Sequence, residues 1–284
     1  MSTAVPVVAG PVAPADREGD GSVAARALAK ALALGRAWRL ELDQLLRSRL
    51  FLFVTVALPL IFATIAFYMF EGSPRSEDAM TIALTAGLMG MWSATLLGSG
   101  NTITRLRRWA ILEQLVGSPA STFAFTVPFA VASASLGVYS LVATLVWSAL
   151  VFDMPLHVEQ PLLLVLSTPA TVLSVGLLGL LFASAFILWP TATGLANFFE
   201  YPVWMLSGML VPISELWPPL RVASYLLAPT WGVQATLDSA SGDPGAPAAV
   251  AMCVLLSVLY VGVTAILLRK FEWLARSSGT LPLQ

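Results

Sequence analysis

The chain has 284 residues, of which 57% are hydrophobic and 11% are charged, and its mean hydropathy is +0.82. A single water-soluble core of this length does not use so much apolar surface, so the composition excludes one and indicates an integral membrane protein. The formal net charge of −1 gives no sign of a polyanionic partner such as nucleic acid. One cysteine, Cys253, excludes an internal disulfide.

The N-terminal part of the chain is predicted to be a disordered tail followed by an amphipathic helix. Residues 1–22 are rich in Pro, Gly and Ala and lack the apolar stretch of a signal peptide. Over residues 23–49 leucines share one helical face with Trp38, and most charges, including that of Arg47, lie opposite, whereas Arg39 breaks the pattern. We expect this helix to lie in the cytoplasmic membrane interface with Trp38 at headgroup depth. The alternative is a solvated arm that packs on another subunit.

Six later stretches are apolar and long enough to cross a bilayer, which takes about 20 helical residues. They cover approximately residues 50–70, 80–103, 123–152, 161–189, 194–214 and 246–268. An apolar piece between the last two is too short to cross and contains Pro229, so it is predicted to form a re-entrant segment within 215–237. The predicted fold is an all-α integral membrane protein with six transmembrane helices in residues 50–276, an external re-entrant hairpin between helices five and six, and a short tail over 277–284.

The distribution of positive charge orients these spans. All of the 15 Lys and Arg residues except Arg75 and Arg221 fall before Leu50, between Arg105 and Arg108, or after Leu268. With six spans these three groups lie on one side of the membrane, which the positive-inside rule makes the cytoplasm. Both termini are therefore predicted to be cytoplasmic.

A basic amphipathic run over residues 103–117 separates the second and third spans. Its arginines, Arg105, Arg107 and Arg108, cannot rest in hydrocarbon, while its leucines and Trp109 offer apolar surface for docking. Gly117 would end a helix there. We interpret the run as a cytoplasmic helix that meets a partner.

The sequence contains no arrangement typical of catalysis. Neither Lys30 nor Lys270 follows the glycine that a P-loop requires, so the chain cannot bind ATP in that way. The only histidine, His157, falls in a predicted external loop and is read as a solvated residue, and the spans contain no pair of carboxylates. We expect no enzymatic activity, no metal site and no cofactor in this chain.

Glu200 is the one acidic residue that falls inside a predicted span. An ionisable group at that depth is a functional candidate by default, although a position near the interface would let it reach water or bond to a neighbouring helix. Asn197, Phe198 and Trp204 accompany it, and the four residues either line a translocation path or serve ordinary helix packing. The sequence leaves both readings open.

Two motifs make the chain resemble the membrane subunit of type-2 ABC exporters. Leu112-Glu113-Gln114-Leu115 with Ser118-Pro119 is similar to the family's coupling helix, and Leu206-Ser207-Gly208 with Pro212, Pro218, Pro219 and Ala228-Pro229 is similar to its fifth span and external hairpin. The resemblance implies ATPase coupling through Arg105, Arg107, Arg108, Trp109, Leu112, Glu113, Gln114 and Leu115, and an external gate that includes Ser207, Gly208, Pro212, Pro218 and Pro229. Residues 108–111 depart from the family, which often has an acidic residue and a Gly-Thr pair there.

The resemblance implies a transport complex in a bacterial cell membrane. A separate P-loop ATPase would bind ATP and Mg²⁺, a second permease subunit, identical or not, would complete the path, and the surrounding lipid would contact the amphipathic helix. The uncharged spans suggest an amphiphilic or apolar cargo. Two alternatives stay open, namely a secondary transporter driven by an ion gradient and a membrane scaffold that transports nothing.

Overall fold

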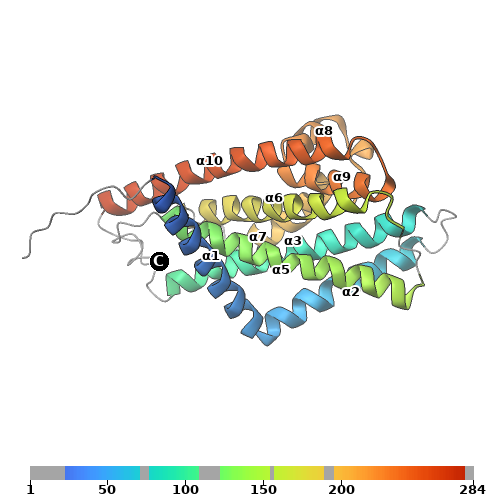
Figure 1. Cartoon of the computed structure of the whole chain (residues 1–284), viewed down its shortest axis with the longest axis horizontal. Helices are drawn as coiled ribbons and strands as arrows, with labels where there is room; N and C mark the ends of the chain where they lie inside the picture. The colour runs from blue at the N-terminus through green and yellow to red at the C-terminus, as the bar shows by residue number, and fades with distance from the viewer. Residues whose placement is uncertain (1–22, 71–76, 109–121, 154–156, 189–194, 279–284) are drawn as a thin grey trace, which may run out of the picture.

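The computed structural model of the chain describes residues 23–70, 77–108, 122–153, 157–188 and 195–278, and all regular structure in these ranges is helical (Figure 1). The α-helices and the 3₁₀ helix η2 of these ranges have the following bounds: α1 Val23–Arg47, α2 Arg49–Phe70, α3 Glu77–Arg108, α5 Thr122–Val151, α6 Pro161–Leu188, α7 Leu195–Leu206, η2 Ile213–Glu215, α8 Pro218–Tyr225, α9 Ala228–Ser241 and α10 Ala246–Ser278. Four of them, α2, α5, α6 and α10, are long and apolar enough to cross a membrane.

The long helices form one bundle, in which α3, α5, α6 and α10 run beside one another along the length of the molecule (Figure 1). Helix α3 lies at its centre, because side chains on every face of its middle part are buried, among them Leu84, Leu88 and Trp92. The small residue Gly90 allows α2 to approach closely, since a Cβ there would lie 2.4 Å from a ring carbon of Pro59. Helix packing thus depends on glycines at the contact points.

The outside of the bundle is apolar, unlike the surface of a water-soluble protein. Large apolar side chains such as Leu150, Leu162 and Ile266 are more than two-thirds exposed on its outside. Hydroxyl groups are buried inside, where Thr95 and Thr144 donate to the backbone carbonyl four residues earlier at 2.8 Å. Such a surface is stable in contact with lipid and not with water.

Helices α1 and α2 meet at a sharp angle (Figure 1), and Ser48 explains the break between them. The Ser48 hydroxyl accepts the backbone N–H of Phe51 at 3.3 Å, which is the bond of a helix N-cap to the third residue of the next helix. Helix α1 then crosses the bundle and packs against α5. The amphipathic segment expected over residues 23–49 is therefore a separate helix that rests on the bundle.

Helix α7 is shorter than the predicted fifth span, because it ends at Leu206 and not near residue 214. The cause is Gly208, which adopts a φ of +81°, a conformation that glycine reaches without strain. The backbone N–H groups of Met209 and Leu210 turn back to the carbonyl of Trp204 at 3.1 and 3.2 Å. Twelve residues of α-helix span only about 18 Å, so the described part of α7 does not by itself cross a bilayer.

The segment after α7 folds back as a helical hairpin made of η2, α8 and α9. Pro218 occupies the first position of α8 and Pro229 the second position of α9, where the missing N–H costs no helical hydrogen bond. Helix α9 lies between α6 and α10 and also contacts α3. Pro229, which was expected to interrupt an apolar segment, instead helps to begin α9.

Candidate functional site

The Glu200 side chain connects α7 to the centre of the bundle. The hydroxyl of Ser93 on α3 donates to Glu200 Oε1, and the two oxygens lie 2.5 Å apart. Ser93 is 2% exposed, whereas Glu200 is only half-buried. Glu200 thus takes a partner on a neighbouring helix, which is one of the possibilities that the sequence left open, and its side chain is partly exposed.

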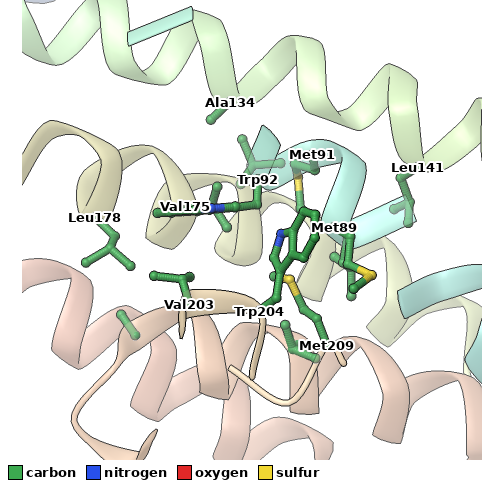
Figure 2. Close-up of a cluster of buried hydrophobic side chains, with 14 of the residues drawn as sticks. Met89, Met91, Trp92, Ala134, Leu141, Val175, Leu178, Val203, Trp204 and Met209 are labelled. Carbon is green, nitrogen blue, oxygen red and sulfur yellow. The ribbon is translucent and has the colours of Figure 1, made fainter. Parts of the chain in front are cut away.

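Trp204 lies one turn after Glu200 and points into the core (Figure 2). It is 5% exposed, and its ring meets Phe62 of α2 edge to face at a centroid distance of 5.2 Å. Figure 2 places it among Trp92, Met89, Met91 and Met209. Trp204 therefore serves packing in this structure and does not line an open path.

The opposite face of α7 is exposed and aromatic. Phe198 and Tyr201 are 65% and 66% exposed, and Met205, one turn further, is also exposed. The side chain of Asn197 lies outside the described part of the structure. Of the four residues expected along the path, Phe198 and Glu200 thus reach the surface of the chain, and Trp204 does not.

The residues of the expected external gate shape the turns around the hairpin. Ser207 is buried and donates to the carbonyl of Val203 at 2.6 Å, and Gly208 provides the left-handed turn that ends α7. Pro212 is exposed at the start of η2. With Pro218 and Pro229 at helix starts, all five residues determine where helices begin and end, and the structure leaves a gating role untested.

Three polar contacts that sequence reasoning missed attach the hairpin to the bundle. The Tyr260 hydroxyl on α10 accepts the backbone N–H of Ala228 at 3.2 Å and donates to the carbonyl of Leu226 at 3.1 Å. On α6, the Thr171 hydroxyl donates to the Gly232 carbonyl at 2.9 Å, and a Cβ on Gly232 would lie 2.9 Å from that hydroxyl oxygen. The third contact holds the far end of α9, as described next.

The C-terminal end of α9 is capped by the segment that precedes α6. Gly242 ends α9 in a left-handed conformation with a φ of +82°. The backbone N–H groups of Glu159 and Gln160 donate to the carbonyls of Ala240 and Ser239, each at 3.1 Å, and the Gln160 amide donates to the Gly242 carbonyl at 2.9 Å. Carbonyls that have no partner within the helix are thus satisfied by another loop.

Asp238 near this end has a perturbed acidity. Burial raises its pKa above the ordinary value of 3.8, the nearby charge of Asp243 raises it further, and a hydrogen bond from Gln234 lowers it. Helix α9 is not among the four helices long enough to cross a membrane. The group therefore favours its neutral form more than a free aspartate does.

Trp38 was expected to lie among lipid headgroups, and in the structure it joins the amphipathic helix α1 to the bundle. The Trp38 indole N–H donates to Ser135 of α5 at 3.3 Å, and the ring is half-buried. Arg39 and Arg47 are exposed. Trp38 thus joins α1 to α5, while the two arginines remain free to meet the surrounding medium.

The side chains of all the expected coupling residues lie outside the described part of the structure. Arg105, Arg107 and Arg108 belong to the last turns of α3, but their side chains lie outside the description. The others, Trp109, Leu112, Glu113, Gln114 and Leu115, lie outside the described residues altogether. Helix α3 nevertheless runs without a break from Ser93 to Arg108, so it leads directly from the Glu200 contact to the predicted coupling helix.

No group of His, Cys, Asp and Glu side chains capable of holding a metal is present among the described residues. His157 lies on the surface, 3.3 Å from Glu159, with 81% of its side chain exposed.

The apolar exterior, the buried hydroxyls and the long apolar helices define a multi-pass integral membrane protein. The sequence model of one family, described as ABC-2 type transporter, matches residues 33–240, from within α1 to the end of α9. The chain therefore belongs to the ABC-2 type transporter family, and its membrane domain is that of a transporter permease, not of a catalytic subunit. Permeases of this family generally work with ATP-binding subunits. No curated protein matches the chain.

Proposed function

We propose that the chain is the transmembrane subunit of an ATP-driven exporter for an amphiphilic or apolar compound such as a drug, a lipid or a glycolipid. The observation that carries this proposal is the match of the ABC-2 family over residues 33–240, which run from within α1 almost to the end of α9. A partner ATPase would bind ATP and Mg²⁺, and the permease would hydrolyse nothing.

The proposed topology has six crossings with both termini in the cytoplasm. Helices α2, α5, α6 and α10 would supply four of them, α3 another, and the segment over residues 194–214 that contains α7 the remaining one, with the hairpin after it as an external re-entrant segment. The starts of α6 and α10 and the end of α9 meet at one end of the bundle, which supports placing the hairpin on the external side, away from the basic end of α3. The natural setting would be a bacterial cell membrane.

The proposed mechanism transmits force along α3. Residues 103–117 would dock on the ATPase, with Glu113 and Gln114 supplying polar contacts and the apolar side chains supplying most of the buried area. Because α3 is a continuous helix in the middle of the bundle, a displacement of its cytoplasmic end reaches Ser93 and Glu200. Two permease subunits would enclose the path, and the α8–α9 hairpin would close its external end.

The test is the charge reversal Glu113→Arg in the complex with its ATPase. We expect membrane insertion to be unchanged, co-purification of the ATPase to fall at least tenfold, and export to be lost, because a like-charged or unpaired group in a docking interface is costly. The matched control is Glu215→Arg, which reverses an exposed charge of η2 on the opposite side. Undiminished transport by Glu113→Arg would contradict the coupling role.

Measuring export after the proton gradient has been dissipated distinguishes an ATP-driven exporter from a secondary transporter. Export that continues on ATP after the gradient is removed supports the exporter, whereas export that stops and ignores ATP supports an ion-coupled mechanism. A stable complex that moves no compound under either condition would identify a scaffold.

A further inference from the structure

We propose that the outward face of α1 binds anionic phospholipids and that Arg36, Arg39 and Arg47 recognise their headgroups. This role goes beyond the proposed function, because it involves neither the ATPase nor the cargo and needs only the membrane setting of the chain. Its basis is the fixed orientation of α1 on the bundle.

One side of α1 is fixed on the bundle. Trp38 donates its indole N–H to Ser135 of α5 at 3.3 Å. Glu41 and Leu45 follow Trp38 at three and seven positions, a spacing that places all three on one helical face, and they are 2% and 5% exposed. A roll of the helix about its axis would break these contacts, so the opposite face of α1 is turned away from the part of the protein that the structure describes.

The opposite face carries a stripe of exposed arginines. At about 100° per residue, Arg36, Arg39 and Arg47 fall within a sector of about 80°, and the centre of this sector lies almost opposite the buried face. Asp43 shares the sector, but it leaves a surplus of positive charge there, and the buried Glu41 belongs to the other face. Within the described residues no ion pair joins these arginines to an acidic side chain.

Leucines interrupt the positive charge on this outward face. Leu28, Leu32 and Leu46 are 61%, 54% and 43% exposed and fall in or beside the arginine sector. Hydrocarbon alone does not suit the arginines, and water alone does not suit the leucines. The headgroup region suits both, since an arginine can extend its charged end toward the phosphates while the leucines reach the first part of the acyl chains. Helix α1 crosses the bundle at the end where α3 and α10 finish, at an angle to both (Figure 1), as a helix in that region would.

The surplus charge selects anionic headgroups over neutral ones. A guanidinium group binds a phosphate through two parallel hydrogen bonds. In phosphatidylcholine an ammonium group offsets the phosphate, whereas in phosphatidylglycerol the negative charge has no such partner. Arg49 extends the positive charge past the corner at Ser48, because it is the first residue of α2 and is exposed. Positive charge at a membrane surface, without acidic partners in the described part of the chain, therefore complements a lipid of net negative charge.

The experiment compares a fluorescent reporter on α1 with one on α10. Gly35→Cys places the reporter beside the stripe, one turn before Arg39, at an exposed position where a Cβ meets no atom within 4 Å. Leu255→Cys is the matched position on the outside of α10, 61% exposed, in a part of the helix that carries no charge before Arg269. Each is made separately with Cys253→Ser, which removes the buried native cysteine, and is labelled with an NBD fluorophore.

The full chain is reconstituted in phosphatidylcholine bilayers that contain a small fraction of nitroxide-labelled phosphatidylglycerol or nitroxide-labelled phosphatidylcholine. We expect the labelled phosphatidylglycerol to quench the reporter at position 35 about threefold more efficiently, or better, than the labelled phosphatidylcholine, and both to quench equally at position 255. Equal quenching at position 35, or the same preference at position 255, would overturn the proposal. A reporter at position 35 that neither lipid quenches would also overturn it, because α1 would then be a solvated arm or be covered by another subunit.

Three variants with the reporter at position 35 test the arginines themselves. Arg36→Gln/Arg39→Gln/Arg47→Gln should abolish the preference, whereas the corresponding triple lysine variant should keep at least half of it, because it retains the charge and loses only the two-pronged geometry. Arg269→Gln/Lys270→Gln removes two exposed cations from the last turns of α10 and should keep the preference in full. A triple glutamine variant that still prefers phosphatidylglycerol would refute the role of the arginines.

Salt provides an independent test of the electrostatic origin. Raising the ionic strength from about 0.15 M to about 1 M shortens the screening length from about 8 Å to about 3 Å, so the preference at position 35 should fall by at least about half. A preference that is unchanged at high salt would contradict recognition by charge. Every measurement uses the permease without its ATPase, so these results stand apart from the outcome of the Glu113→Arg test.

Discussion

The contact between α9 and α6 is so close that one methyl group should disrupt it. A Cβ on Gly232 would lie 2.9 Å from Thr171 Oγ1, 3.0 Å from Thr171 Cα and 3.1 Å from Thr171 Cγ2. Since one of these atoms belongs to the backbone, a change of the Thr171 rotamer cannot relieve the overlap. Gly232→Ala therefore forces α9 away from α6 and weakens the hydrogen bond from Thr171 to the Gly232 carbonyl.

The size of the effect follows from these two losses. Overpacking of a well-packed site costs about 1–3 kcal/mol, and the hydrogen bond contributes about 1 kcal/mol. The sum of about 2–4 kcal/mol corresponds to a decrease in the thermal unfolding midpoint on the order of 5–15 °C for a chain of this size. The assay is thermal unfolding of the purified protein in nanodiscs.

Gly262→Ala is the matched control, because position 262 on α10 is exposed and a Cβ there meets no atom within 4 Å. It should leave the midpoint unchanged or raise it slightly, since alanine is the better helix former. The double variant Gly232→Ala/Thr171→Ala should lose less stability than the sum of the losses of the two single variants, because the smaller side chain at position 171 removes two of the three close contacts. Equal midpoints for Gly232→Ala and Gly262→Ala would refute the close packing of α9 on α6.

Two further predictions concern other parts of the hairpin. Tyr260→Phe leaves the buried N–H of Ala228 and the carbonyl of Leu226 without their partner, so we expect a loss of about 1–3 kcal/mol in unfolding free energy, measured in nanodiscs beside Tyr225→Phe, whose ring is exposed. Because the folded state raises the pKa of Asp238, it holds that proton more tightly than the unfolded chain, and stability decreases as pH rises from about 3.8 through the raised value. Asp238→Asn should therefore raise the unfolding midpoint at pH 7 and flatten its dependence between pH 4 and pH 7; a midpoint that falls at pH 7 would show that the carboxylate stabilises the fold.

The long helices could be predicted because length and hydropathy suffice to identify them. Helix α2 begins at Arg49 and α6 at Pro161, each within a residue of the expected start, since a charge or a proline marks the boundary. The family could be predicted for a similar reason, because its motifs are local in sequence. The orientation and the number of crossings remain predictions.

The end of α7 could not be placed in advance, because the residues from Gly208 to Ile213 are as apolar as the helix before them. The helix ends because Gly208 adopts a left-handed conformation, and hydropathy does not predict that conformation. In the same way Ser93 looks like the many hydroxyl residues that bond to their own helix, such as Thr95 and Thr144. Its actual partner lies 107 positions away, and only the packing of α3 against α7 reveals it.

Polar contacts hold α9 to the bundle at three points along its length. Helix α9 is bonded near its start to Tyr260, in its middle to Thr171 and at its end to Gln160, so contacts from α6 and α10 both hold it in place. Between α7 and α3, the described residues show the bond from Ser93 to Glu200, while the buried indole nitrogens of Trp92 and Trp204 have no hydrogen-bond partner among them.

Buried donors without acceptors cost free energy, so the two indole nitrogens lower the stability of this part of the core. In the proposed mechanism a displacement of α3 by the ATPase would reach this region first through the contact between Ser93 and Glu200.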